Sequence, residues 1–342
     1  MGEHDRCRGC IFGAWLGDAS GAVLEFRGRP SEEDLQRALD LPGGGAHNVG
    51  PGQITDDGEL TCALLHGLID GNSTFDLNKI ATRYGQWILS KPFDLGGTLR
   101  KSLPKACNMK THQAEMVRRG AKLSNTSQSN GCLMRISPMG IFCRNLPLED
   151  IYTAVSEEVS LSHQNESAVQ ACCLWVICLC LLIKSGNRIE SWERAKDFMQ
   201  GKVNVEVADW IRMIDAPSCD LLVHKPSGWL KISFIYGLRY LIQGLNYTES
   251  ITTIMRQGGD TDTNACIIGS LIAAADGYST LPQERLQKVI NWSPNNGGIK
   301  RPKWLRVSTC SEIVDRLIEI APTTLRMIGS TSEYKTKTKQ KY

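Results

Sequence analysis

Residues 168–183 have the sequence AVQACCLWVICLCLLI, which is the longest apolar run in the chain. The run is 16 residues long and includes Gln170, whereas a helix that spans a membrane needs about 20 apolar residues. Its side chains also leave no polar face for contact with water. We therefore predict a helix that is buried on nearly all sides at the centre of the fold, and no membrane partner.

Most other segments carry apolar residues at helical spacing, and none alternates as a half-buried strand would. The expected helices cover residues 10–23, 58–69, 77–90, 148–162, 191–198, 229–243, 247–255, 263–275, 281–290 and 310–320. No linker between them is long or polar enough to separate two domains. The pattern predicts one compact all-α domain over residues 1–329.

The charge of the chain is concentrated at its end. The formal net charge is +3, and residues 330–342 supply all of it, with four lysines against Glu333. That lysine-rich segment is typical of a solvated, disordered tail. The body is then neutral and offers no concentrated basic face, so we expect no partner among nucleic acid duplexes.

The 13 cysteines do not indicate a disulfide scaffold, because their number is odd and several lie inside the apolar run. Cys7 and Cys10 form a C-x-x-C pair, but the second pair that a zinc site would need is missing. The first residues are charged where a signal peptide is apolar. We expect reduced thiols and a cytoplasmic protein, and the sequence is also compatible with the nucleus.

Two short acidic segments each precede an apolar helix: GQITDDGE at residues 52–59 and GGDTDTNA at residues 258–265. Each segment alone is also a good helix start, since Asp and Thr are preferred capping residues. If both helix starts converge, however, four carboxylates meet at one point, which is costly unless a cation neutralises them. Oxygen donors favour Mg²⁺, Mn²⁺ or Ca²⁺ over zinc, and four carboxylates can share two such ions.

The two acidic segments belong to a series of six motifs. The series runs GAWLGDASGAVLEF (13–26), PGQITDD (51–57), PFDLGGT (92–98), SNGCLMRISPMG (129–140), LSHQN (161–165) and GGDTDTNA (258–265). In this order the motifs resemble those of the ADP-ribosylglycohydrolase family, and the resemblance covers residues 10 to about 278. It implies an orthogonal multi-helix bundle that hydrolyses the bond between the anomeric carbon of ADP-ribose and an acceptor.

The resemblance also implies two divalent cations, Mg²⁺ or Mn²⁺, held between the acidic segments. The six metal-binding positions that carry over are all present: Thr55, Asp56, Asp57, Asp260, Asp262 and Thr263. Many family members have T-D-D-T at the first segment, whereas this chain has Gly58 and then Glu59. We expect Glu59 to be a solvated glutamate that the helix dipole favours.

Further residues are implied by the same resemblance. Glu25 is expected to be a general base or a gate for the leaving group, beside a mobile segment at residues 27–30, and Asp57 and Asp262 are expected to be catalytic with it. Asp94 is expected to hold the substrate or to exchange a proton, and His163 to contact its adenosine side.

The substrate diphosphate is expected to bind backbone N–H groups around two loops. These loops comprise Gly96, Gly97 and Thr98, and Ser129, Asn130 and Gly131. We expect Arg135 to pair with a carboxylate rather than with phosphate.

Two alternatives to a hydrolase stay open at this point. A branch of the same family serves as lens crystallins, and a non-catalytic ADP-ribose-binding module would share the binding loops. The intact set of metal-binding positions favours the hydrolase. The substrate is then an ADP-ribosylated protein or a small ADP-ribose conjugate, with an arginine, serine or O-acetyl ester linkage, and we expect a monomer.

Overall fold

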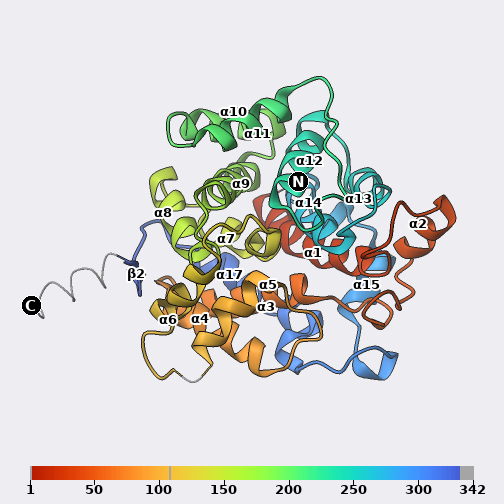
Figure 1. Ribbon diagram of the computed structural model, residues 1–342, viewed down its shortest axis with the longest axis horizontal. Coiled ribbons are helices and arrows are strands. Elements are labelled where there is room, and N and C mark those ends of the chain that lie inside the picture. The colour runs from red at the N-terminus through yellow and green to blue at the C-terminus, as the bar shows by residue number, and fades with distance from the viewer. Residues whose placement is uncertain (1, 108, 332–342) are drawn as a thin grey trace, which may run out of the picture.

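The computed structural model describes residues 2–107 and 109–331, and within these ranges its regular secondary structure is almost entirely helical (Figure 1). The α-helices are α1 (Glu3–Gly21), α2 (Glu32–Leu39), α3 (Asp56–Gly71), α4 (Leu77–Leu89), α5 (Gly97–Ser102), α6 (Gln113–Ala121), α7 (Ser137–Phe142), α8 (Leu148–Val159), α9 (Glu166–Ser185), α10 (Arg188–Met199), α11 (Val205–Asp215), α12 (Leu230–Gln243), α13 (Tyr247–Met255), α14 (Thr261–Asp276), α15 (Gln283–Ile290), α16 (Val307–Ser311) and α17 (Val314–Ile320). The all-α prediction is confirmed.

The remaining elements are short. Single 3₁₀ turns are η1 (Leu103–Ala106), η2 (Lys122–Ser124), η3 (Asn130–Cys132), η4 (Tyr278–Thr280), η5 (Pro294–Asn296) and η6 (Lys303–Leu305). Strands β1 (Phe75–Asp76) and β2 (Met327–Ile328) pair in parallel, with Phe75 opposite Met327. This pair ties the last described segment to the start of α4.

The expected helices agree with the observed ones to within about three residues at each end, with two exceptions: α1 begins at Glu3 rather than at residue 10, and residues 310–320 are divided between α16 and α17. Helices α2, α5, α6, α7 and α11 were not predicted. Most of them are short, and a stretch of fewer than about ten residues shows too few turns for its period to stand out.

Helix α9 contains the apolar run and lies at the centre of the fold, packed against α7, α8 and α10. Within the described ranges it is the one helix long and apolar enough to cross a membrane, but 89% of its most apolar window is buried inside the protein. The side chain of Asn165 caps its start, and Gly186 ends it with a φ of +70° that favours glycine. It is the buried core helix that the sequence predicts.

Helices α1 and α14 approach each other closely through a row of glycines on α1, at positions 9, 13, 17 and 21. A Cβ atom at Gly13 would lie 2.4 Å from the carbonyl oxygen of Gly269, and one at Gly17 would lie 2.2 Å from that of Ala265. Only hydrogen fits at these contacts. The row therefore sets the end of α1 against the beginning of α14, where the second acidic segment lies.

Two further expectations concern the tail and the thiols. Residues 332–342, most of the predicted tail, lie outside the described residues. Ser330 and Thr331 pack on the body instead: Ser330 is buried, and the backbone N–H of Thr331 donates to Glu157 at 3.0 Å. These two residues, which the sequence assigned to the tail, therefore contact the body. All 13 cysteines are free thiols, as expected.

Candidate active site

The structure brings the two acidic segments together, because α3 begins at Asp56 and α14 begins directly after Asp260. One carboxylate oxygen each of Asp18, Asp57 and Asp262 lies within 4.8 Å of the others. Glu25, Asp260 and Asp262 form a second group of the same size. The convergence that the sequence left open is therefore present.

Asp18, on α1, completes this cluster and caps α3. Its carboxylate accepts hydrogen bonds from the backbone N–H of Thr55 at 2.9 Å and of Gly58 at 2.8 Å, and from Thr55 Oγ1 at 2.8 Å. Burial raises the pKa of Asp18 to about 7. Asp18 was not among the residues predicted from the sequence, although a carboxylate inside a glycine-rich apolar helix was a usable signal.

The cluster is strongly acidic and buried. Burial raises the pKa values of Asp56, Asp57 and Asp262 well above the usual range, and the neighbouring carboxylates raise them further. Within the described residues, Asp57 Oδ1 is buried and accepts no hydrogen bond. An oxygen-only donor set with an unsatisfied carboxylate oxygen fits a divalent cation.

Glu25 reaches this cluster from the turn after α1. The chain reverses at Phe26, which has a φ of 60°, and the turn is held by Phe26 N to Gly259 O and by Gly259 N to Arg27 O, both at 3.1 Å. Such a conformation is uncommon for a large side chain. Two backbone hydrogen bonds thus anchor the beginning of the segment that was expected to be mobile.

His47 lies between Glu25 and Asp94 and was not identified from the sequence. Its Nε2 atom is 3.1 Å from Glu25 Oε2 and 3.3 Å from Asp94 Oδ2. Both distances are short enough for an ion pair. The geometry does not qualify as a hydrogen bond, because neither His47 Nε2 nor Glu25 Oε2 has a hydrogen-bond partner among the described residues. Burial, followed by the charges of Asp94 and Asp260, raises the pKa of Glu25 to about 8. No motif surrounds His47, so local sequence carried no signal for it.

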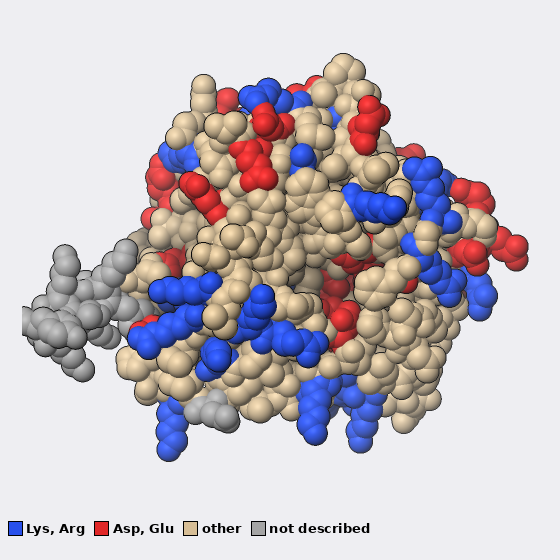
Figure 2. Space-filling view, viewed as in Figure 1, with Lys and Arg blue, Asp and Glu red and all other residues tan. Residues whose placement is uncertain are grey.

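A cavity of about 660 Å³ opens onto the cluster. In Figure 2 it appears as a hollow with acidic side chains at its floor. The predicted site residues that line it are Glu25, Asp56, Asp94, Gly96, Gly97, Thr98, Ser129, Asn130, Gly131, Asp260 and Thr263. Thr55, Asp57 and Asp262 lie deeper, within the buried cluster.

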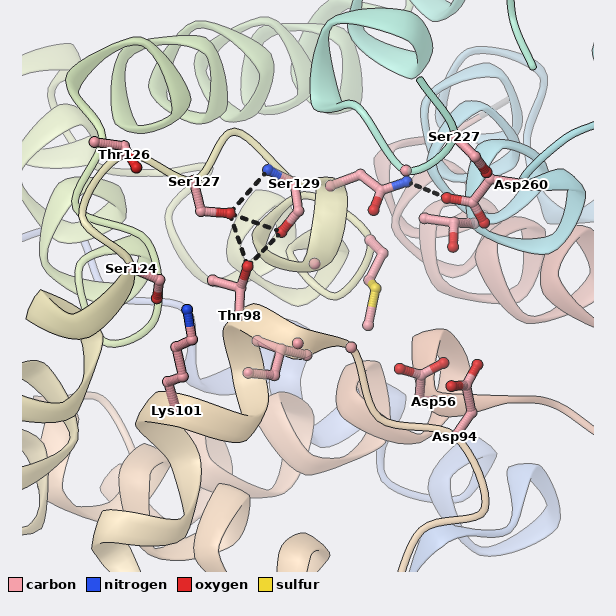
Figure 3. Close-up of a pocket in the computed structure, with 18 of the residues that line it drawn as sticks. Asp56, Asp94, Thr98, Lys101, Ser124, Thr126, Ser127, Ser129, Ser227 and Asp260 are labelled. Atoms are coloured by element: carbon pink, nitrogen blue, oxygen red, sulfur yellow. Dashed lines mark hydrogen bonds between the residues drawn. The ribbon is translucent and has the colours of Figure 1, made fainter. Parts of the chain in front are cut away.

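Hydroxyl groups form the middle of the cavity wall. Thr98, Ser127 and Ser129 are joined by hydrogen bonds of 2.7 to 3.3 Å between their side-chain oxygens, and Figure 3 shows them between the acidic residues and Lys101. The backbone N–H of Asn130 already donates to Gly228 at 3.0 Å, and its side chain donates to Asp260 at 2.7 Å. This particular N–H is therefore already paired within the protein, and binding of the diphosphate at this loop stays a prediction for its other groups.

His163 supports this wall from behind. Its ring is fully buried, with Nε2 2.8 Å from Ser129 Oγ and Nδ1 2.8 Å from Ser162 Oγ. Both ring nitrogens are thus engaged by protein hydroxyls. The expected direct contact between His163 and the substrate is not part of this arrangement, and His163 instead orients Ser129.

Arg135 pairs with a carboxylate, as predicted. Its guanidinium donates to Glu158 at 2.9 Å and to the carbonyl oxygen of Gly131 at 2.7 Å, and Tyr84 donates to the same carboxylate at 2.6 Å. All three side chains are fully buried. This network fixes the backbone of the loop that carries Ser129.

The expectation for Glu59 is wrong. The residue is 2% exposed, and its carboxylate accepts hydrogen bonds from Arg301 at 2.6 and 2.9 Å and from Trp87 at 2.7 Å. Burial raises the pKa of Glu59 in spite of these partners. A residue 242 positions away along the chain neutralises it, which no local pattern could indicate.

An all-helical fold that joins two acidic helix starts at one end of a hydroxyl-lined cavity defines the class of the ADP-ribosylglycohydrolases. Comparison with known proteins agrees: the model of the family described as ADP-ribosylglycohydrolase matches residues 1–322. The chain therefore belongs to the ADP-ribosylglycohydrolase family and is a hydrolase that acts on glycosyl bonds.

Individual relatives are distant but match over most of their length. A putative ADP-ribosyl glycohydrolase of Acanthamoeba polyphaga mimivirus is 27% identical, over 84% of this chain and 91% of the relative. The ADP-ribosyl-[dinitrogen reductase] glycohydrolase of Rhodospirillum rubrum is 25% identical, over 84% and 90%. A solved structure titled ADP-ribosylglycohydrolase-related protein complex has a TM-score of 0.73 at 19% identity, and the match covers 94% of this chain and 99% of that one.

Proposed function

We propose that this chain is a metal-dependent hydrolase that removes ADP-ribose from an ADP-ribosylated protein or small molecule by cleaving the bond at the anomeric carbon of the ribose. The observation that carries the proposal is the convergence of Asp18, Asp57 and Asp262 with Glu25 at one end of the cavity. The Rhodospirillum rubrum relative, named for an ADP-ribosylated protein substrate, supports the substrate class.

The residues that would hold two divalent cations, Mg²⁺ or Mn²⁺, are Thr55, Asp56, Asp57, Asp260, Asp262 and Thr263. Such ions, when bound, supply Lewis acidity to the hydroxyls of the ribose and to the attacking water. Asp18 fixes the backbone of Thr55 and Gly58. Asp18 thereby holds the first acidic segment in position, although Asp18 itself does not line the cavity.

In this proposal Glu25 is the residue that moves a proton. Its carboxyl lines the cavity, and a pKa of about 8 allows it to hold or release a proton near neutral pH. Hydrolysis at an anomeric carbon needs such a group, as general base toward water or as general acid toward the leaving atom. His47 and Asp94 flank Glu25 and restrict where its carboxyl points.

The substrate then lies along the cavity. Its ribose faces the carboxylate cluster, and its diphosphate faces the loop at Gly96, Gly97 and Thr98 and the hydroxyl of Ser129. Hydroxyl and backbone N–H groups at a loop bind phosphate without a full opposing charge. His163, Ser162 and Arg135 keep that wall rigid from behind.

The test is release of ADP-ribose from arginine-linked, serine-linked and O-acetyl ester substrates, with Mg²⁺ or with EDTA. Asp57→Ala and Asp262→Ala should each abolish turnover, and EDTA should do so reversibly. Asp70→Ala is the matched control, because Asp70 pairs with Arg83 on the surface. Full turnover in EDTA would contradict the proposal. Binding of ADP-ribose without turnover of any substrate would instead favour a crystallin or a binding module.

A further inference from the structure

Residues 1–329 have no net charge, but their positive and negative charges lie in different parts of the chain. Between Gly96 and Thr126 the chain carries seven Lys and Arg residues against one carboxylate, Glu115, a net charge of +6. The other residues up to position 329 then carry −6. Six of the seven cations are exposed: Arg100, Lys101, Lys105, Lys110, Arg119 and Lys122. Figure 2 shows Lys and Arg side chains gathered over the region of α5 and α6, beside the acidic hollow.

Lys101 connects this basic face to the cavity. It lies on α5 one turn after Thr98, and it is the one cation among the described residues that line the cavity. Figure 3 shows its amino group directed toward Ser124, on the far side of Thr98 from Asp56 and Asp94. Its Nζ atom has a weak contact of 3.4 Å with the carbonyl oxygen of Leu123. The two ends of the cavity therefore carry opposite charges, with carboxylates at one end and a lysine at the other.

The proposed function sets the direction in which the substrate lies between the two ends of the cavity, and the inference rests on that proposed function. The scissile bond lies at the carboxylate end and the diphosphate lies beside Thr98 and Ser129. The adenosine then extends toward Lys101 and Ser124. Neither a nucleobase nor a ribose needs a cation, whereas a lysine beside hydroxyl groups is suited to phosphate.

We propose that the Lys101 end of the cavity is a subsite for a phosphate group that the substrate carries beyond the diphosphate, on its adenosine side. Two sources have this chemistry: a phosphate monoester on the 2′-hydroxyl of the adenosine ribose, and the diphosphate of a further ADP-ribose unit attached at that hydroxyl. The surrounding exposed cations also attract such an anion from solution.

The test is calorimetric binding in Mg²⁺ of three ligands: ADP-ribose, ADP-ribose 2′-phosphate and a dimer of ADP-ribose. The wild-type chain should bind at least one extended ligand about 3- to 10-fold more tightly than ADP-ribose, and whichever is preferred identifies the source. This preference should shrink as salt is raised, because the lysine is exposed.

Lys101→Gln should remove the preference, and Lys101→Glu should reverse it, while both keep the affinity for ADP-ribose. Lys105→Gln is the matched control, since Lys105 lies on the same face but does not line the cavity. Equal wild-type affinity for all three ligands would overturn the subsite. So would an equal loss for all three in Lys101→Gln, which would assign Lys101 to the diphosphate. If ADP-ribose itself did not bind, the proposed function would fail as well.

Discussion

At the scale of single residues, the surroundings of a carboxylate decide what it does. Glu25, Asp18 and Glu59 are all at least 95% buried, yet each has different partners. Glu59 is neutralised by Arg301, and Asp18 accepts hydrogen bonds from the start of α3. Glu25 faces other carboxylates and His47 instead, which leaves it able to exchange a proton. Only the last arrangement suits acid–base chemistry.

Glu25→Gln tests this assignment. The amide keeps the size of the side chain but cannot take or give the proton, so we expect kcat to fall by about 10²- to 10⁴-fold. Affinity for ADP-ribose should change little, because the metal-binding residues and the hydroxyl wall are untouched. Turnover and calorimetry with the same protein preparation separate the two effects. A variant within threefold of the wild-type rate would assign Glu25 to the loop rather than to the chemistry.

At the scale of elements, the contact between α1 and α14 positions the site. Its glycine row lets two backbones touch, so that carboxylate oxygens of Asp18 on α1 and Asp262 at the start of α14 lie within 4.8 Å of each other. A side chain in this contact would separate the helices. The geometry of the carboxylate cluster therefore depends on residues that have no polar group.

We expect Gly17→Ala to destabilise the protein by about 3 kcal/mol, because its methyl group would meet the carbonyl oxygen of Ala265 at 2.2 Å. Gly28→Ala is the control, since nothing lies within 4 Å of a Cβ at that position, and it should change stability by less than about 0.5 kcal/mol. Urea unfolding followed by circular dichroism measures both. Equal stability of the two variants would show that the helices can separate without cost.

At the scale of the whole molecule, the carboxylate cluster should make stability depend on pH and, under the proposed function, on metal. Its carboxyl groups have pKa values raised above those of the unfolded chain, to about 7 for Asp18 and about 8 for Glu25. The folded state thus holds more protons than the unfolded state between about pH 4 and pH 8. The contribution of the cluster to the free energy of unfolding therefore falls as pH rises through this range. Repulsion between the carboxylates adds to the effect of burial.

Metal-free protein should therefore lose about 5 °C or more in Tm between pH 5 and pH 8. Millimolar Mg²⁺ or Mn²⁺ should restore most of that loss at pH 8, since a bound cation favours the ionised carboxylates and stabilises the folded state by linkage. Asp57→Asn removes one charge, so it should flatten the pH profile of the metal-free protein and weaken the response to metal. Thermal melts in EDTA and in metal measure all three. A flat wild-type profile, or no response to metal, would speak against a cation site at the cluster.

The sequence by itself determined the all-α class, a buried helix containing residues 168–183 and the two acidic helix starts. These features depend on spacing over a few turns or on short motifs, and a local pattern records both. It also predicted that Arg135 pairs with a carboxylate. The short helices were missed because they contain too few turns to show a period.

Tertiary structure decided the rest of the site. Asp18 and Thr55 are 37 positions apart, Glu59 and Arg301 are 242 apart, and His47 meets Glu25 and Asp94 only in the folded chain. Folding likewise engaged both nitrogens of His163 and placed Lys101 at the far end of the cavity from the carboxylates. A local pattern cannot record such pairs, because the distance between them is set by how the helices pack, and here that packing begins with the glycines of α1.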